Sequence, residues 1–297
     1  MIETRVADLR SRLKGRLPLG FGVSGPLATR LYSARDVERL IDTARDQGVS
    51  IFDTAPSYGA GRGERRLGRS IGNDPAAFVM TKAGLTSGRW LDRQSDFAPV
   101  SIVQSVEASL RRLRRDRIDL LWLHGPGRKQ INDPLKETLT ELIDAGKVAA
   151  IGITSRDQPA SELADAAPFS ALMAPAHEQS SSLSGRPSNA ILFGIECLKH
   201  VRSDRGFPRH RSHLWRATRT LLRKDQPIRG SISVDAAFGH AFETAGCDVV
   251  IMTTSKSSRI EQNRIICQRV VERRRNSHNQ AQVDLVRALP ESQGAVV

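Results

Sequence analysis

Alternating strand and helix patterns over residues 17–180 constrain the fold of this 297-residue chain more than any other feature. Short runs such as VSIFDTA (49–55) and AFVMTKA (77–83) are apolar nearly throughout, and helical patterns separate them. Strands that are buried on both faces in this way are typical of a parallel sheet covered by helices. Five successive helix–strand repeats fit either an open doubly wound sheet or a closed eight-stranded barrel.

The position of the polar residues favours the barrel. Asp53, Lys82, His124 and the pair Thr154-Ser155 each lie at the carboxyl end of their strand. In a (β/α)8 TIM barrel these ends converge on one mouth, and a length near 300 residues suits a single domain of this α/β class. We therefore predict such a barrel for the chain.

The sequence also predicts where the barrel begins and ends. We assign residues 1–16 to an N-terminal extension, 17–272 to the barrel and 273–297 to a loose C-terminal tail. The pattern weakens between residues 181 and 229, so the region around the seventh strand is atypical. There the basic stretch 199–229 replaces the expected strand.

The net charge of +13 raises the question of a nucleic-acid partner. No DNA- or RNA-binding motif and few base-stacking aromatics accompany the arginines, which are spread along the chain. Solvated faces, or an anionic cofactor or substrate, explain the charge better. No apolar run approaches the roughly 20 residues that span a bilayer, and the first 20 residues lack the apolar core of a signal peptide. We expect a cytoplasmic protein without a membrane partner.

Two further signals are set aside. The three cysteines form no CxxC, and His210 and His213 have no evident third ligand, so no metal site is predicted. GFGVSG (20–25) spells GxGxxG, but a weak strand precedes it and a proline follows it, whereas the dinucleotide fingerprint needs a strand before and a helix at the third glycine. We interpret it as a first barrel strand with a tight glycine turn.

Five motifs give a specific resemblance. GVSIFDTAPSYGAGRGERRLG (48–68) places a tyrosine five residues after the aspartate that ends a strand, and a glutamate and a glycine close the loop. This motif resembles the signature of the aldo-keto reductase superfamily. Four others follow in the family's order: FVMTKAG (78–84), SLRRLRRDRIDLLWLHGPG (109–127), GKVAAIGITS (146–155) and DVVIMTTSKSSRIEQN (248–263).

The resemblance implies a catalytic group of four residues. Hydride reduction of a carbonyl leaves negative charge on oxygen, so a proton donor is needed within hydrogen-bond reach. Tyr58 would be that donor, and the Lys82 ammonium would stabilise its tyrosinate form. Asp53 would hold Lys82 in place, and His124 would orient the carbonyl oxygen. Each residue also has an ordinary structural explanation when taken singly. Asp53 could cap a turn and Tyr58 could be a loop residue, while Lys82 could be a solvated charge and His124 a structural histidine.

The resemblance also implies a nicotinamide cofactor, NADP(H) rather than NAD(H), because a 2′-phosphate needs cationic partners. The loop between the last strand and the last helix would bind phosphate. Thr154, Ser155 and Gln179 would bind the nicotinamide carboxamide. The adenosine end would contact Thr254, Ser255, Lys256, Arg259 and Asn263.

Several positions depart from the family pattern. Ser155 stands where the family has asparagine, Thr253 where it has glycine, and Gln262 where it has glutamate. In addition, Gln179 is displaced from the expected position, and no aromatic residue that could stack on the nicotinamide follows the sixth strand. These departures leave three hypotheses open. The first is an NADP(H)-dependent oxidoreductase acting on an aldehyde, ketone or aldose. The second is a nicotinamide-binding redox sensor or regulatory protein with little turnover. The third is a barrel lyase or aldolase that forms a Schiff base on Lys82.

Overall fold

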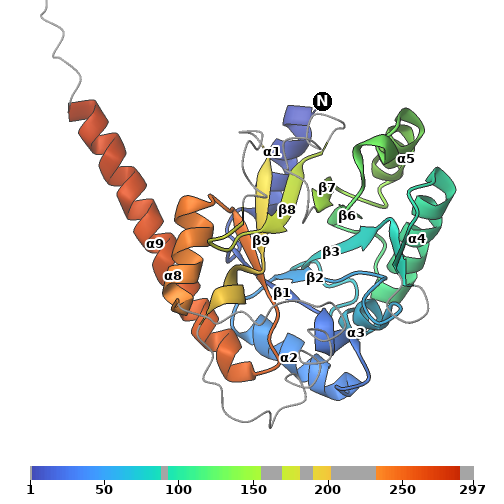
Figure 1. Ribbon diagram of the computed structural model, residues 1–297, viewed down its shortest axis with the longest axis horizontal. Helices are drawn as coiled ribbons and strands as arrows, with labels where there is room; N and C mark the ends of the chain where they lie inside the picture. The colour runs from blue at the N-terminus through green and yellow to red at the C-terminus, as the bar shows by residue number, and fades with distance from the viewer. Residues whose placement is uncertain (1, 88–92, 155–168, 181–189, 202–231, 288–297) are drawn as a thin grey trace, which may run out of the picture.

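The computed structural model describes residues 2–87, 93–154, 169–180, 190–201 and 232–287. Eight parallel strands form a closed barrel in the order β1-β10-β9-β8-β7-β6-β3-β2 (Figure 1). The predicted (β/α)8 barrel is therefore confirmed. The barrel strands are β1 (Leu19–Gly22), β2 (Ile51–Asp53), β3 (Phe78–Ala83), β6 (Leu120–His124), β7 (Ile151–Thr154), β8 (Ala171–Pro175), β9 (Ile191–Ile195) and β10 (Val249–Met252).

Helices pack around the outside of the barrel (Figure 1). The first of them after β1, α2, begins with a reciprocal capping box formed by Ser33 and Asp36. The outer helices are α2 (Ala34–Asp46), α3 (Arg62–Ser70), α4 (Pro99–Leu113), α5 (Asp133–Asp144), α8 (Val234–Gly239) and α9 (Ser257–Arg287). Short helical turns are η1 (Gly25–Ala28), η3 (Arg128–Gln130), η4 (Cys197–His200) and η5 (His240–Thr244).

Two apolar cores result from the alternation of side chains along the strands. One core fills the barrel and includes Met80, Trp122 and Phe193. The rings of Trp122 and Phe193 meet edge to face, with centroids 5.1 Å apart. The other core lies between the strands and the helices, where alternate strand residues such as Val79 and Leu121 pack against the helical faces.

The N-terminal segment is part of the body of the barrel. Residues expected as an extension form helix α1 (Ile2–Leu13), whose Val6 and Leu9 are buried within the interior core. The guanidinium of Arg16, just after α1, lies over the ring of Phe78, the first residue of β3. Helix α1 therefore closes the barrel at the amino-terminal ends of its strands.

The seventh strand was predicted wrongly. It is β9, which pairs in parallel with β8 and β10, so the basic stretch does not replace it. That stretch begins after β9, and its residues 202–229, with His210 and His213, lie outside the described residues. The run ILFGI (191–195) is too short for strand or helix periodicity to show, so the sequence alone does not distinguish the two.

The C-terminal segment also differs from expectation. Helix α9 continues to Arg287, so residues 273–287 are helical where a loose tail was expected. Arg273 pairs with Asp235 of α8 at 2.9 Å, and Arg274 donates to the Cys247 carbonyl at 3.0 Å. These contacts anchor the middle of α9, while its far end projects away from the barrel (Figure 1).

A small antiparallel hairpin, β4 (Leu85–Ser87) with β5 (Arg93–Ser95), follows β3 and was not predicted. Its strands are too short to carry a periodic signal. Among the described helices, none is long and apolar enough to cross a membrane.

Candidate active site

Three charged or polar side chains are directed into the mouth of the barrel by strand alternation. Asp53, Lys82 and His124 end or nearly end β2, β3 and β6. Each is an even number of residues from an interior-core residue of its own strand, namely Ile51, Met80 and Trp122. Side chains two apart on a strand share a face, so all three point to the inside of the barrel.

Lys82 and Asp53 form a buried ion pair. The Lys82 Nζ donates to Asp53 Oδ1 at 2.5 Å, to Oδ2 at 2.7 Å and to the Thr54 carbonyl at 2.9 Å. The two side chains are only 3% and 7% exposed. Neither charge has solvent to stabilise it, so each depends on the other.

The environment fixes the charge of Lys82. Burial alone would lower its pKa, but the Asp53 carboxylate and the Tyr58 hydroxyl outweigh burial, so the pKa of Lys82 is raised. Burial also raises the pKa of Asp53, while the Lys82 charge acts in the opposite direction. At neutral pH Lys82 is therefore a fixed, protonated cation.

Tyr58 lies beside this pair, in the turn between β2 and α3. The Lys82 Nζ is 5.1 Å from the centroid of the Tyr58 ring. The ring of His124 approaches that of Tyr58 edge to face, with centroids 6.3 Å apart and an interplanar angle of 87°. The structure thus brings the four predicted catalytic residues into one cluster.

The glycine after Tyr58 has a steric reason. Gly59 has a φ of +63°, and a Cβ at this position would lie 1.8 Å from the Ala28 carbonyl oxygen. A side chain would therefore be both strained and in collision with backbone. The turn that carries Tyr58 therefore approaches η1 too closely for any residue but glycine at position 59.

A second buried carboxylate supports the site from behind. Glu64 of α3 is completely buried, accepts a hydrogen bond from Thr81 Oγ1 at 2.7 Å and pairs with Arg112 of α4. Thr81 directly precedes Lys82 on β3. The sequence marked Glu64 as part of the family signature without showing these partners.

The next strands carry the residues expected at the nicotinamide. Thr154 ends β7 and is in register with His124 on one side and with Met173 on the other. Thr154 and Met173 are buried. Gln179 lies four residues beyond the end of β8 with an exposed side chain, and Ser155 lies outside the described residues. The neighbour of Thr154 in the sheet is therefore a thioether and not an amide.

The start of α9 borders a hollow of about 580 Å³. Lys256 lines the hollow and is exposed, and Ser255 lines it and is half-buried. Arg259, in the first turn of α9, is also exposed, and Thr254 is half-buried. Exposed cations and free helix amides suit a phosphate group. The lining residues are Tyr32, Asp36, Arg39, Leu40, Thr43, Ser255, Lys256, Ser257 and Ser258.

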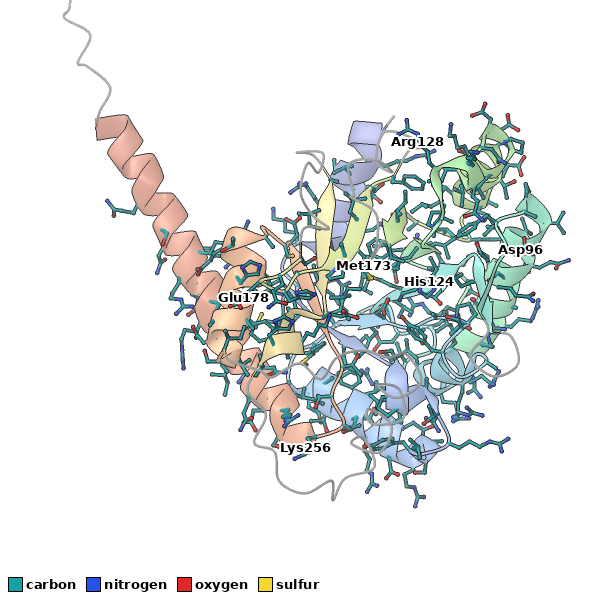
Figure 2. The ribbon with its side chains drawn as sticks, in the orientation of Figure 1. Asp96, His124, Arg128, Met173, Glu178 and Lys256 are labelled. Atoms are coloured by element: carbon teal, nitrogen blue, oxygen red, sulfur yellow. The ribbon has the colours of Figure 1, made fainter. Side chains whose placement is uncertain are left out.

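At two residues near this end of the barrel, the structure differs from what the sequence predicted. Asn263 is buried, and its Nδ2 donates to the sulfur of Met252 at 3.2 Å. Arg39 of α2 lines the hollow and was not predicted, because nothing in the sequence shows that α2 and α9 pack together. Figure 2 places Lys256 at the edge of the molecule and His124 and Met173 nearer the middle of the barrel. Among the described residues, no cluster of three metal-ligating side chains occurs.

The fold and the site define a (β/α)8-barrel protein with a tyrosine, lysine, aspartate and histidine at its carboxyl-terminal mouth. The family model described as Aldo/keto reductase family matches residues 18–175. The chain belongs to the aldo/keto reductase family.

Relatives with similar sequences match only part of the chain. Aldo-keto reductase YhdN of Bacillus subtilis is 36% identical over 132 residues, which cover 42% of this chain and 39% of the relative. D-threo-aldose 1-dehydrogenase of a Pseudomonas species is 35% identical over 163 residues, covering 46% and 49%. The matches therefore span less than half of either relative.

Solved structures share the fold over most of the chain. A putative aldo-keto reductase from Pseudomonas aeruginosa superimposes with a TM-score of 0.65 at 22% identity, covering 86% of this chain and 91% of that one. The glycerol dehydrogenase AKR11B4 from Gluconobacter oxydans gives a TM-score of 0.62 at 22% identity, with coverage of 86% and 91%. At this identity the likeness concerns the fold.

Proposed function

We propose that this chain is an NADP(H)-dependent oxidoreductase that interconverts a carbonyl and an alcohol, with Tyr58 as the general acid and base. The observation that carries the proposal is the buried Lys82–Asp53 pair beside Tyr58. A structural ion pair would not need a tyrosine ring against its cation at the mouth of a barrel.

Each residue of the cluster has a chemical task. The nicotinamide, when bound, supplies or accepts the hydride. Tyr58 donates a proton to the carbonyl oxygen, and the fixed charge of Lys82 stabilises the tyrosinate that remains. Asp53 keeps Lys82 protonated and in place. His124 orients the carbonyl oxygen and assists the proton transfer, and the same groups act in reverse for alcohol oxidation.

The cofactor would extend from the mouth to the start of α9. Thr154, Ser155 and Gln179 are proposed to hold the carboxamide end. Lys256 and Arg259 supply the cations that a 2′-phosphate needs, which favours NADP(H) over NAD(H). The remaining proposed contacts at the adenosine end are Thr254, Ser255 and Asn263.

We propose a small-molecule aldehyde, ketone or aldose as the substrate. Among the matched relatives, D-threo-aldose 1-dehydrogenase and 6-dehydroglucose reductase are both named for sugar substrates. Their names support an aldose or another sugar carbonyl as the first class to test. No membrane or nucleic-acid partner is part of the proposal.

A second candidate function is a nicotinamide-binding regulatory or redox-sensing protein with little turnover. Met173 next to Thr154 and the exposed position of Gln179 favour this candidate, because both weaken the expected grip on the carboxamide. The Schiff-base lyase is disfavoured, since Lys82 is buried, ion-paired and protonated, and a Schiff base needs a neutral amine.

The test compares the wild type with Tyr58→Phe. NADPH consumption is followed with a panel of aldoses, aromatic aldehydes and diketones, and NADPH binding is measured by fluorescence. We expect Tyr58→Phe to lose roughly 10²- to 10⁴-fold in kcat, the usual contribution of a general acid, and to bind NADPH as before. Thr140→Ala on α5 removes a hydroxyl far from the mouth and serves as the matched control.

The other outcomes separate the candidates. Saturable NADPH binding without turnover of any carbonyl would favour the regulatory protein. Turnover that survives Tyr58→Phe would contradict the proposed proton donor.

A further inference from the structure

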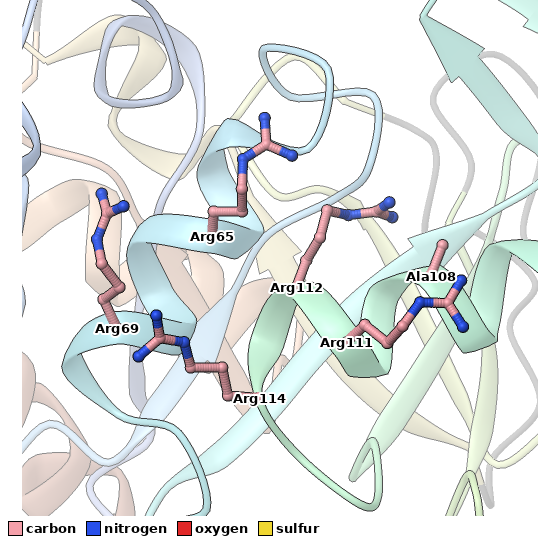
Figure 3. A pocket seen from close by; sticks show the side chains of 6 residues that line it. All are labelled: Arg65, Arg69, Ala108, Arg111, Arg112 and Arg114. Carbon is pink, nitrogen blue, oxygen red and sulfur yellow. The ribbon is translucent and has the colours of Figure 1, made fainter.

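A hollow on the outer wall of the barrel is lined almost entirely by arginine. It lies between α3 and α4, has a volume of about 380 Å³ and is open to solvent. Its lining residues are Arg65, Arg69, Ala108, Arg111, Arg112 and Arg114. Figure 3 shows Arg65 and Arg69 on one helix and Arg111, Arg112 and Arg114 at the end of the other.

Two of these arginines are neutralised by carboxylates. Arg112 pairs with the buried Glu64, and its Nη2 reaches Ser109 Oγ at 3.3 Å. Arg69 donates through Nε to Glu38 at 2.8 Å. In both cases a guanidinium with five N–H groups retains donors beyond those used in the pair.

The other three have little or no acidic compensation. Arg65 donates to the Ala60 carbonyl at 3.0 Å, and Arg111 is 3.9 Å from Glu107, a carboxylate that also binds Lys147. Within the described part of the chain, neither Arg65 nor Arg114 forms an ion pair with a carboxylate. The hollow therefore carries a net positive charge.

Helix stability alone does not account for all of these arginines. Arg65 and Arg69 are four residues apart on α3, a spacing at which like charges repel. Arg114 has a left-handed φ of +57° just beyond α4, a conformation that arginine seldom adopts. The helix dipole favours Arg111 and Arg112 in the last turn of α4 and Arg69 in the last turn of α3, but it does not favour Arg65, which lies near the start of α3.

The chemistry of the lining favours phosphate. Guanidinium forks bind the oxygens of phosphate in pairs, and several of them around one space match a ligand with several such groups. A volume near 380 Å³ is at the lower end of the range for small-molecule sites. We propose that this hollow is a binding site for a small polyanion carrying two or more phosphate groups.

This site is separate from the catalytic mouth but shares a support with it. Arg65 holds the Ala60 carbonyl, two residues beyond Tyr58. A Cβ on Gly61 would lie 2.7 Å from Arg112 Cδ, so that side chain also packs against the tyrosine turn. The proposal itself rests on the hollow and its charges, and it holds whether or not the chain turns over a carbonyl.

The test measures pyrophosphate binding by isothermal titration calorimetry at low ionic strength, with the thermal unfolding midpoint as a second readout. We expect saturable binding that weakens as salt is added, and a raised midpoint because the ligand binds the folded state. The variant Arg65→Gln/Arg114→Asn should bind at least tenfold more weakly. Asparagine is chosen because it tolerates the left-handed conformation.

A matched control removes the same charge elsewhere. Arg10→Gln/Lys14→Gln on and after α1 also removes two exposed cations, and it should bind pyrophosphate as the wild type does. Hydrogen exchange should show protection by pyrophosphate at residues 60–72 and 108–116, in addition to any at the proposed phosphate site at the start of α9. Equal losses in the two double variants, or no protection at residues 60–72 and 108–116, would overturn the site.

Two further outcomes would also overturn the proposal. One is the absence of saturable pyrophosphate binding to the wild type. The other is binding of an RNA oligonucleotide that depends on Arg65 and Arg114 while pyrophosphate fails to compete, which would indicate a surface for a nucleic-acid backbone.

Discussion

Thr81 donates a hydrogen bond of 2.7 Å to Glu64, a carboxylate with no exposed surface. The contact joins α3 to the residue of β3 that precedes Lys82, and Glu64 is joined in turn to Arg112 of α4. One buried charge thereby ties two helices to the strand that carries the cation of the candidate active site.

Replacing Glu64 tests how much its contacts with Thr81 and Arg112 contribute to the free energy of unfolding. Glu64→Gln keeps an acceptor for Thr81 but leaves Arg112, whose side chain is only 23% exposed, without its counter-charge. We expect the free energy of unfolding in urea to fall by about 1–3 kcal/mol. Glu38→Gln, which breaks the exposed pair with Arg69, should cost less than about 1 kcal/mol. Equal costs would show that the burial of Glu64 adds nothing.

The Lys82–Asp53 pair should show strong energetic coupling. Lys82→Met leaves a buried carboxylate uncompensated, so the free energy of unfolding at pH 7 should fall by roughly 3–5 kcal/mol. Asp53→Asn/Lys82→Met removes both charges and should be more stable than Lys82→Met alone. A double-mutant cycle in guanidinium chloride measures the coupling, and additive effects of the two single changes would contradict it.

The pKa values of the same pair predict how stability depends on pH. The pKa of Asp53 is raised from its ordinary 3.8, so its contribution is fully present below 3.8 and declines as the pH rises through the raised value. The pKa of Lys82 is raised from 10.5, so its contribution is present below 10.5 and is lost as the pH rises through the raised value. As the pH rises, the stability of the wild type relative to Asp53→Asn/Lys82→Met should therefore fall once through the raised pKa of Asp53 and again through the raised pKa of Lys82, and it should stay level between them. Urea unfolding between pH 3 and 11 tests this, and a relative stability that increases above pH 10 would contradict it.

The glycine after Tyr58 should not tolerate a methyl group. Gly59→Ala adds a Cβ that would lie 1.8 Å from a backbone oxygen at a φ of +63°. Gly48 offers a matched control, since its φ is +78° and a Cβ there would meet nothing within 4 Å. Gly48→Ala should cost about 1–2 kcal/mol of unfolding free energy, the price of the left-handed conformation alone. Gly59→Ala should cost more and should lower the turnover proposed for Tyr58, and equal costs would contradict the steric argument.

Much of the fold could be predicted from local pattern. The strand VSIFDTA and the helix cap at Ser33 can be predicted from neighbouring residues, because burial on both faces and helix capping both depend on local sequence. The strand ILFGI could not be assigned, since five apolar residues suit either element. The extent of α9 was missed because its basic continuation lacks an apolar stripe, and polar helices give no periodic signal.

In the candidate site, too, local features could be predicted from the sequence and contacts between distant segments could not. Asp53, Lys82 and His124 were placed correctly at strand ends, and strand parity then directs them inward. Their catalytic roles stay predictions. The pairing of Thr154 with Met173 depends on the register between strands, and the position of Arg39 in the α9 hollow depends on how two helices pack. Neither contact can be predicted from a contiguous stretch of the sequence.

Leu9 is buried in the interior core at the amino-terminal ends of the strands, so α1 blocks that end of the barrel to ligands. With that end closed by α1, the described barrel offers its carboxyl-terminal mouth as the route by which water, protons and ligands reach Lys82. Two ligands that bind at this mouth would share one opening, so the order in which they bind would be set by which of them lies deeper.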